Sequence, residues 1–93
     1  MAECQRTVTV FHRQGLHARP AAVFVHVAKR FASHIKVKKG RKIVDGKSIM
    51  GLLTLAANRG ARIAIVADGE DAEQALEQLA AVVTQPLPES PAP

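Results

Sequence analysis

Hydrophobic and polar residues alternate along four short stretches of the chain, and this alternation predicts β-strands. The stretches are residues 7–12, 35–38, 42–44 and 61–67. The last of them, ARIAIVA, is apolar enough to lie in the interior of a sheet. Lys39-Gly40 separates the second stretch from the third, which predicts a β-hairpin.

Three other segments repeat their apolar residues with the spacing of a helix. Residues 18–30 contain no glycine and carry Pro20 near their start, where proline costs a helix no hydrogen bond. A short helix over 49–55 follows Ser48, which suits the N-cap position, and a third helix follows the acidic pair Glu70-Asp71. The residues expected to face the core are Ala21, Phe24, Val25, Ala28 and Phe31, then Leu52 and Leu55, then Ala72, Ala75, Leu76, Leu79, Val82 and Val83.

The resulting order, β-α-β-β-α-β-α, predicts an α+β sandwich in which helices cover one face of an antiparallel or mixed sheet. A chain of 93 residues is the size of one domain. We assign residues 1–85 to that domain. The prolines at positions 86, 88, 91 and 93 predict a disordered tail over residues 86–93.

The charge, the cysteine count and the apolar runs of the sequence indicate the kind of partner and the cellular compartment to expect. The net charge of +5 suits an acidic partner, which leaves nucleic acid, an anionic membrane surface and an acidic protein face open. Cys4 is the only cysteine and lies in a terminus that we expect to fray, so an intramolecular disulfide is excluded. No apolar run approaches the ~20 residues that span a bilayer, and no signal peptide is evident, so we expect a cytoplasmic protein.

The stretch GLHARPA, residues 15–21, combines residues that suit an anion site. Gly15 allows a sharp turn, and His17 falls at the start of the first predicted helix. There the backbone amides of Ala18 and Arg19 and the helix dipole favour a phosphate, and the Arg19 guanidinium adds a fixed positive charge. An imidazole nitrogen is a nucleophile, so these residues together suit transient carriage of a phosphoryl group.

Nucleic-acid binding by the basic residues and metal binding by the histidines are less well supported than an anion site. The lysine-rich tract over residues 36–42 could bind nucleic acid, but it holds no aromatic residue on which bases could stack. A hairpin with solvated lysines explains it better. Four histidines, His12, His17, His26 and His34, have no ligand-like spacing, so we expect no metal and no cofactor.

GLHARPA and a second stretch, GKSIMGLL at residues 46–53, together identify a resemblance. The chain resembles HPr, the histidine-containing phosphocarrier family of the bacterial phosphoenolpyruvate-dependent sugar phosphotransferase system. The resemblance covers residues 7–83. It implies an open-faced β-sandwich, in which three helices cover one face of a four-stranded antiparallel sheet.

The resemblance also implies the chemistry. His17 would accept a phosphoryl group on Nδ1 from phosphorylated enzyme I and pass it to the A domain of a sugar permease, while Arg19 contacts the phosphoryl group. Ser48 matches the serine that HPr kinase/phosphorylase modifies. The chain would therefore be a monomeric substrate of these enzymes, and not an enzyme itself; transcriptional regulators are further partners that the family implies.

A partner surface is expected on the two helices that carry the motifs. It consists of Val23, Lys47, Ile49, Met50 and Leu53, with Arg19, Lys29 and Lys47 as a basic rim, and it would suit an acidic protein face. Gln14 departs from the asparagine of many relatives, and the proline-rich tail extends past the usual end of the family. A regulatory paralogue of the nitrogen-related phosphotransferase system carries the same His17 motif. The motif therefore does not distinguish a carrier of the sugar system from one of the nitrogen-related system.

Overall fold

The computed structural model describes residues 3–87 and has the predicted order of elements. From residue 88 onward, the predicted tail lies outside the described residues. The elements are β1 (Glu3–Thr9), α1 (Ala18–Ala28), β2 (His34–Lys39), β3 (Lys42–Asp45), α2 (Ile49–Thr54), β4 (Arg62–Asp68) and α3 (Ala72–Thr84).

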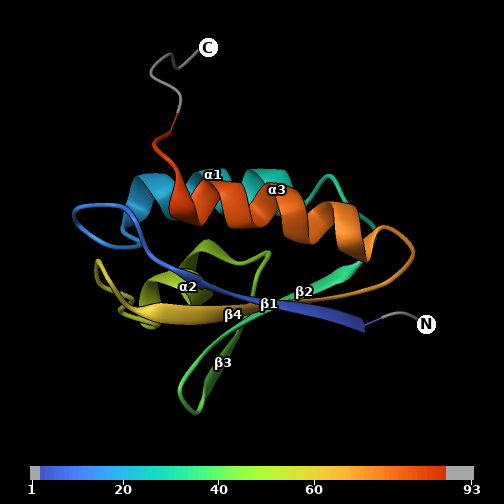
Figure 1. The fold of residues 1–93 in the computed structure, drawn as a ribbon, viewed down its shortest axis with the longest axis horizontal. Helices are drawn as coiled ribbons and strands as arrows, with labels where there is room; N and C mark the ends of the chain where they lie inside the picture. The colour runs from blue at the N-terminus through green and yellow to red at the C-terminus, as the bar shows by residue number, and fades with distance from the viewer. Residues whose placement is uncertain (1–2, 88–93) are drawn as a thin grey trace.

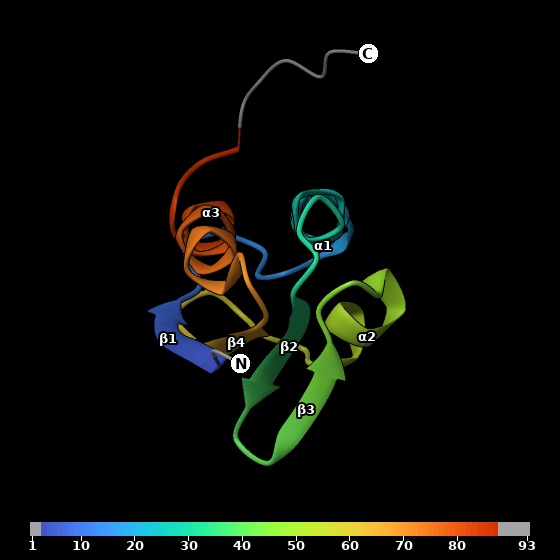
Figure 2. The same cartoon turned by 90° about the vertical axis from the view of Figure 1, so that its right-hand side faces the viewer.

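The four strands form one antiparallel sheet in the order β1-β4-β2-β3. Helices α1 and α3 run side by side over one face of this sheet, and α2 lies beside α1 at the β3 end (Figures 1 and 2). The interior position of β4 confirms the prediction from its apolar sequence. The molecule is thus the expected α+β open-faced sandwich.

Strand β1 differs from the prediction at both ends. It begins at Glu3 because β4 extends to Asp68 and pairs with it there, and Cys4 pairs with Ala67. The expectation that Cys4 lies in a frayed end was therefore wrong. The strand ends at Thr9, since the next backbone groups bond elsewhere: Val10 N–H donates to Ala61 O at 2.9 Å, and Phe11 N–H donates to Val83 O at 2.9 Å.

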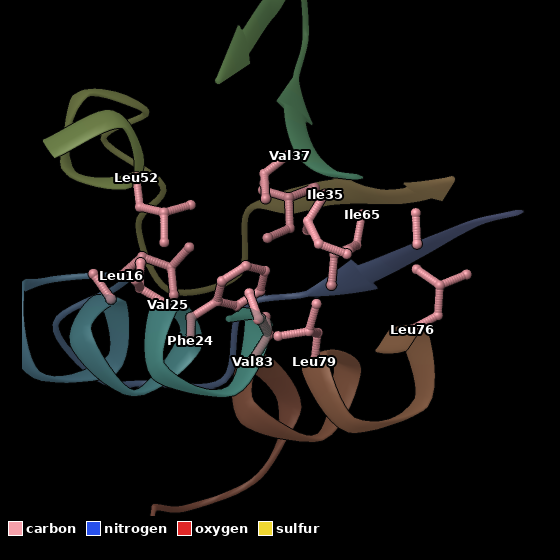
Figure 3. Packing of buried hydrophobic residues seen from close by; sticks show 14 of the residues in the cluster. Leu16, Phe24, Val25, Ile35, Val37, Leu52, Ile65, Leu76, Leu79 and Val83 are labelled. Atoms are coloured by element: carbon pink, nitrogen blue, oxygen red, sulfur yellow. The ribbon is translucent and has the colours of Figure 1, made fainter. Parts of the chain in front are cut away.

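The core lies between the sheet and the helices (Figure 3). Phe24 of α1, Leu79 of α3 and Ile65 of the interior strand β4 are fully buried in this cluster. Phe31 and Val82, which we expected to be buried, are only half-buried at the edge of this cluster. The remaining predicted core residues are buried, as is Ala80.

Two lysines of the β2-β3 hairpin bind carbonyl groups at a helix end. Lys39 Nζ donates to the carbonyls of Leu55 and Ala56, both at 3.3 Å, and Lys42 Nζ donates to Thr54 O at 2.6 Å. These carbonyls belong to the last residue of α2, to its C-cap and to the residue after it, where positive charge is favourable. Lys39 and Lys42 are therefore not simply solvated, as we had expected, but tie the hairpin to α2.

Asp71 joins two loops at the other end of the sheet. It occupies the N-cap of α3, yet its carboxylate makes no capping bond. It accepts hydrogen bonds from Ala32 N–H at 2.8 Å and from both the N–H and the hydroxyl of the buried Ser33. The Ser33 hydroxyl is the largest cause that lowers the pKa of Asp71, and the Ala32 amide lowers that pKa further.

Candidate functional site

The loop between β1 and α1 is held against the segment that follows α2. Gly15 N–H donates to His12 O at 2.8 Å, and Leu16 N–H donates to Ala57 O at 2.9 Å. Gly15 has φ +77°, and a Cβ there would overlap Ala57 O and lie 2.9 Å from the Cα of Asn58. The first position of the motif therefore requires glycine for both its conformation and its close approach.

His17 occupies the N-cap of α1, as its place in the motif predicts. Its backbone is extended, with φ −84° and ψ −167°, and its carbonyl accepts the Ala21 N–H at 3.0 Å. The side chain makes no capping hydrogen bond and is half-exposed. The imidazole is thus presented at the helix end and is not used to cap it.

The first turn of α1 follows directly. Ala18 and Arg19 are its first two residues, where backbone N–H groups have no carbonyl acceptor within the helix. Pro20, at the third position, is buried and has no N–H to leave unsatisfied. The N-terminus of α1 therefore directs its backbone N–H donors and the positive pole of the helix dipole toward His17.

His17 and Arg19 line one shallow depression of about 330 Å³. Arg13 and Gln14 line it as well, and the described residues around it include no Asp or Glu. Sequence reasoning missed Arg13, although its place two residues before Gly15 and its positive charge were visible signals. The arrangement can bind an anion beside a ring nitrogen.

His12 connects this loop to α3. It was predicted to belong to a strand, but it lies in the loop, where it is 7% exposed and its Nε2 is 2.6 Å from Val82 O. The ring of Phe11 meets it edge-on, with centroids 5.7 Å apart. Figure 1 shows the loop beside the C-terminal end of α3, and Pro86 and Leu87 complete the rim of the depression. His12 thus anchors the site to a second helix.

The second motif forms the turn into α2. Gly46 N–H donates to Ile35 O at 2.8 Å, and a Cβ on Gly46 would lie 2.5 Å from a methyl group of Ile35. Ser48 is the N-cap of α2, as predicted: its hydroxyl accepts the Gly51 N–H at 3.0 Å. A Cβ on Gly51 would lie 3.3 Å from that hydroxyl oxygen, so glycine leaves room for the cap.

The residues predicted to form the partner surface lie mostly on α2. Ile49, Met50 and Leu53 are exposed, Met50 most of all at 71%, and Val23 of α1 is half-buried. Helices α1 and α2 pack against each other, which places these side chains on neighbouring elements. None of them lines the depression at His17, and neither does Ser48.

The predicted basic rim divides into two kinds of residue. Arg19 and Lys29 are exposed on α1 and at its C-cap. Lys47, by contrast, is half-buried, and its Nζ donates to Phe31 O at 2.9 Å. It therefore joins the loop after α1 to the start of α2.

Two kinds of feature are absent from residues 3–87. No group of three or more His, Cys, Asp or Glu side chains in this range could hold a metal ion. No helix within it is long and apolar enough to cross a membrane.

Comparison with known proteins places the chain in a family. Residues 4–85 match the model of the PTS HPr component phosphorylation site. The HPr-like protein Crh of Bacillus subtilis is 48% identical over 87% of this chain and 95% of its own length. The phosphocarrier protein HPr of Haemophilus influenzae is 46% identical over 84% and 92%.

A solved structure agrees with the sequence matches. The crystal structure of the phosphocarrier protein HPr from Bacillus anthracis superposes with a TM-score of 0.85 and is 49% identical, covering 89% of this chain and 99% of the other. Fold and overall length therefore agree. The chain belongs to the HPr family of the phosphotransferase system, and like the relatives named HPr it is a phosphocarrier protein and not an enzyme.

Proposed function

We propose that this chain accepts a phosphoryl group on His17 from phosphorylated enzyme I and passes it to the A domain of a sugar permease. The observation that carries the proposal is the position of the His17 ring. It lies at the N-cap of α1 without a capping bond, and it lines the same depression as Arg19.

The transfer requires one bond to form while another breaks. The lone pair of a ring nitrogen, Nδ1 by resemblance to the family, attacks phosphorus, and the bond from phosphorus to the donor residue of enzyme I breaks with its electrons leaving on that residue. The amides of Ala18 and Arg19 and the Arg19 guanidinium would bind the phosphoryl oxygens. Imidazole is a good leaving group, so the same steps in reverse deliver the phosphoryl group to the permease domain.

Incubation with enzyme I and labelled phosphoenolpyruvate tests this proposal. We expect an acid-labile, base-stable label that is absent from His17→Ala and slower to form in Arg19→Ala. His26→Ala is the matched control, because His26 is exposed on the same helix but does not line the depression. Full labelling of His17→Ala would refute the assignment of the acceptor.

Ser48 is proposed as a site of regulatory phosphorylation by HPr kinase/phosphorylase. Its hydroxyl caps a short helix whose neighbouring residues, Ile49 and Met50, are exposed and apolar. A phosphate would add about two negative charges next to this patch. An acidic partner would then dock less well, so transfer through His17 would slow.

The corresponding experiment uses ATP and the kinase. We expect an acid-stable phosphate that Ser48→Ala abolishes and that Thr54→Ala, which alters an exposed hydroxyl at the other end of α2, leaves in place. Ser48→Asp should also slow labelling by enzyme I. Unchanged kinase labelling of Ser48→Ala would show that another residue is modified.

The exposed patch of Ile49, Met50 and Leu53, together with Val23 on the neighbouring helix α1, is proposed as the docking surface for these partners. Such a patch favours contact with another protein, and the flexible Met50 side chain can adapt to several partners. Met50→Glu should slow labelling by enzyme I at limiting concentration of this protein.

We further propose that the chain acts as a monomer, so sedimentation equilibrium should give a mass of 10.0 kDa.

A further inference from the structure

The loop before His17 brings a second arginine to the site. We propose that Arg13 is a second cation that binds the phosphoryl group carried by His17. The inference rests on the proposed function and extends it to a residue outside both sequence motifs. The ligand of Arg13 would be the phosphoryl group, which is tetrahedral and has three oxygens and about two negative charges.

Arg13 shares the depression with the acceptor histidine. It lines the same hollow of about 330 Å³ as His17 and Arg19, and its side chain is exposed. Within residues 3–87, its guanidinium has no hydrogen-bond or ion-pair partner. The group is therefore available to a ligand, and no internal contact has to be broken for it to bind.

The backbone on both sides of Arg13 is anchored. On one side, the buried His12 ring bonds to Val82 O at 2.6 Å. On the other, Gly15 N–H closes a turn onto His12 O at 2.8 Å, and Leu16 N–H bonds to Ala57 O at 2.9 Å. Because the loop is held in place, only the side chain of Arg13 has to be ordered when an anion binds.

The charge in the depression matches a dianion. The titratable groups that line it are His12, Arg13, His17 and Arg19, and no described acidic residue lines it. One guanidinium offsets only part of the charge of a phosphoryl group. Two guanidiniums, each able to donate two hydrogen bonds, would neutralise it and would stabilise it further as charge develops during transfer.

Arg13→Ala tests the assignment against Arg41→Ala. Both changes remove one exposed arginine, but Arg41 lies in the turn between β2 and β3 and does not line the depression. At fixed ionic strength, we expect Arg13→Ala to slow labelling of His17 by enzyme I about tenfold, the effect of losing one charge-assisted hydrogen bond, and Arg41→Ala by less than about twofold. Equal rates in the two variants would overturn the proposal.

A second measurement removes enzyme I. Inorganic phosphate is titrated into the unphosphorylated protein, and the amide signals of His17 and Ala18 are followed by NMR. We expect the dissociation constant to rise several-fold in Arg13→Ala and to stay unchanged in Arg41→Ala. Slower labelling with unchanged phosphate binding would mean that Arg13 contacts enzyme I and not the phosphoryl group, which also overturns the proposal.

The two arms separate this inference from the proposed function. If the wild-type protein takes no label on His17, the proposed function fails, whereas the phosphate titration still tests Arg13 by itself. If wild type is labelled and Arg13→Ala matches it in both arms, only the role of Arg13 fails.

Discussion

Gly15→Ala is the substitution that most directly links the fold to the site. The residue has φ +77°, a conformation that costs a residue with a Cβ about 1–2 kcal/mol. The new Cβ would also overlap Ala57 O, a backbone atom that cannot rotate away. Overpacking of this kind adds about 1–3 kcal/mol, so the free energy of unfolding should fall by about 2–5 kcal/mol.

The chain supplies its own control for this change. Gly40 has φ +61°, and a Cβ added there would meet no atom within 4 Å, so Gly40→Ala has only the conformational cost of about 1–2 kcal/mol. The free energy of unfolding of a domain of this size is about 5–14 kcal/mol. Gly40→Ala should therefore remain folded at 25 °C, and Gly15→Ala should do so when the wild-type value is above about 5 kcal/mol. Urea unfolding should therefore place Gly15→Ala below Gly40→Ala by at least about 1 kcal/mol.

Function should respond to Gly15→Ala as well. The Ala57 carbonyl that would be displaced also accepts the Leu16 N–H, which holds the residue before His17. Labelling by enzyme I should be slower in Gly15→Ala than in Gly40→Ala when both are folded. Equal stability of the two variants would refute the claim that close packing, and not only conformation, requires glycine at this position.

Three further predictions concern side-chain hydrogen bonds of Asp71, Ser48 and His12. The pKa of Asp71 in the folded protein lies below its ordinary value of 3.8. The ionised carboxylate therefore stabilises the fold above pH 3.8, and this stabilisation is lost as the pH falls through the folded pKa. The urea midpoints of wild type and Asp71→Asn should differ at pH 6 and converge toward pH 2. Ser48→Ala removes an N-cap and should lower the free energy of unfolding by about 0.5–2 kcal/mol, whereas Ser48→Asp should retain most of it; chemical unfolding at pH 7 distinguishes them. His12→Phe removes the bond to Val82 O, so amide hydrogen exchange at Phe11 and at the last turn of α3 should become faster, and unchanged exchange would show that the bond does not hold the loop.

The elements that depend on local pattern were predicted from sequence. Residues 61–67 have a run of apolar residues, and they form the interior strand β4 almost as expected. Ser48 precedes a short apolar segment and caps α2. In both cases the cause lies in the residues of the segment itself: a run of apolar side chains suits an interior strand, and a hydroxyl acceptor suits the start of a helix.

The contacts that depend on tertiary pairing were not predictable from sequence. The start of β1 at Glu3 depends on the length of its partner β4, and the Asp71 carboxylate bonds to residues 38 and 39 positions earlier. The candidate site divides in the same way. His17 and Arg19 stand in one motif, whereas Arg13 lies outside it, in a loop held by tertiary contacts of His12, Gly15 and Leu16.

The most direct test of whether His17 carries the phosphoryl group observes the histidine rings themselves. NMR spectra that correlate imidazole nitrogens with ring protons follow all four histidines while enzyme I and phosphoenolpyruvate are added. We expect that one ring nitrogen of His17 shifts and couples to phosphorus, while His26 and His34 keep their signals. A phosphorus coupling at any other histidine, or none at His17 when label is incorporated, would contradict it.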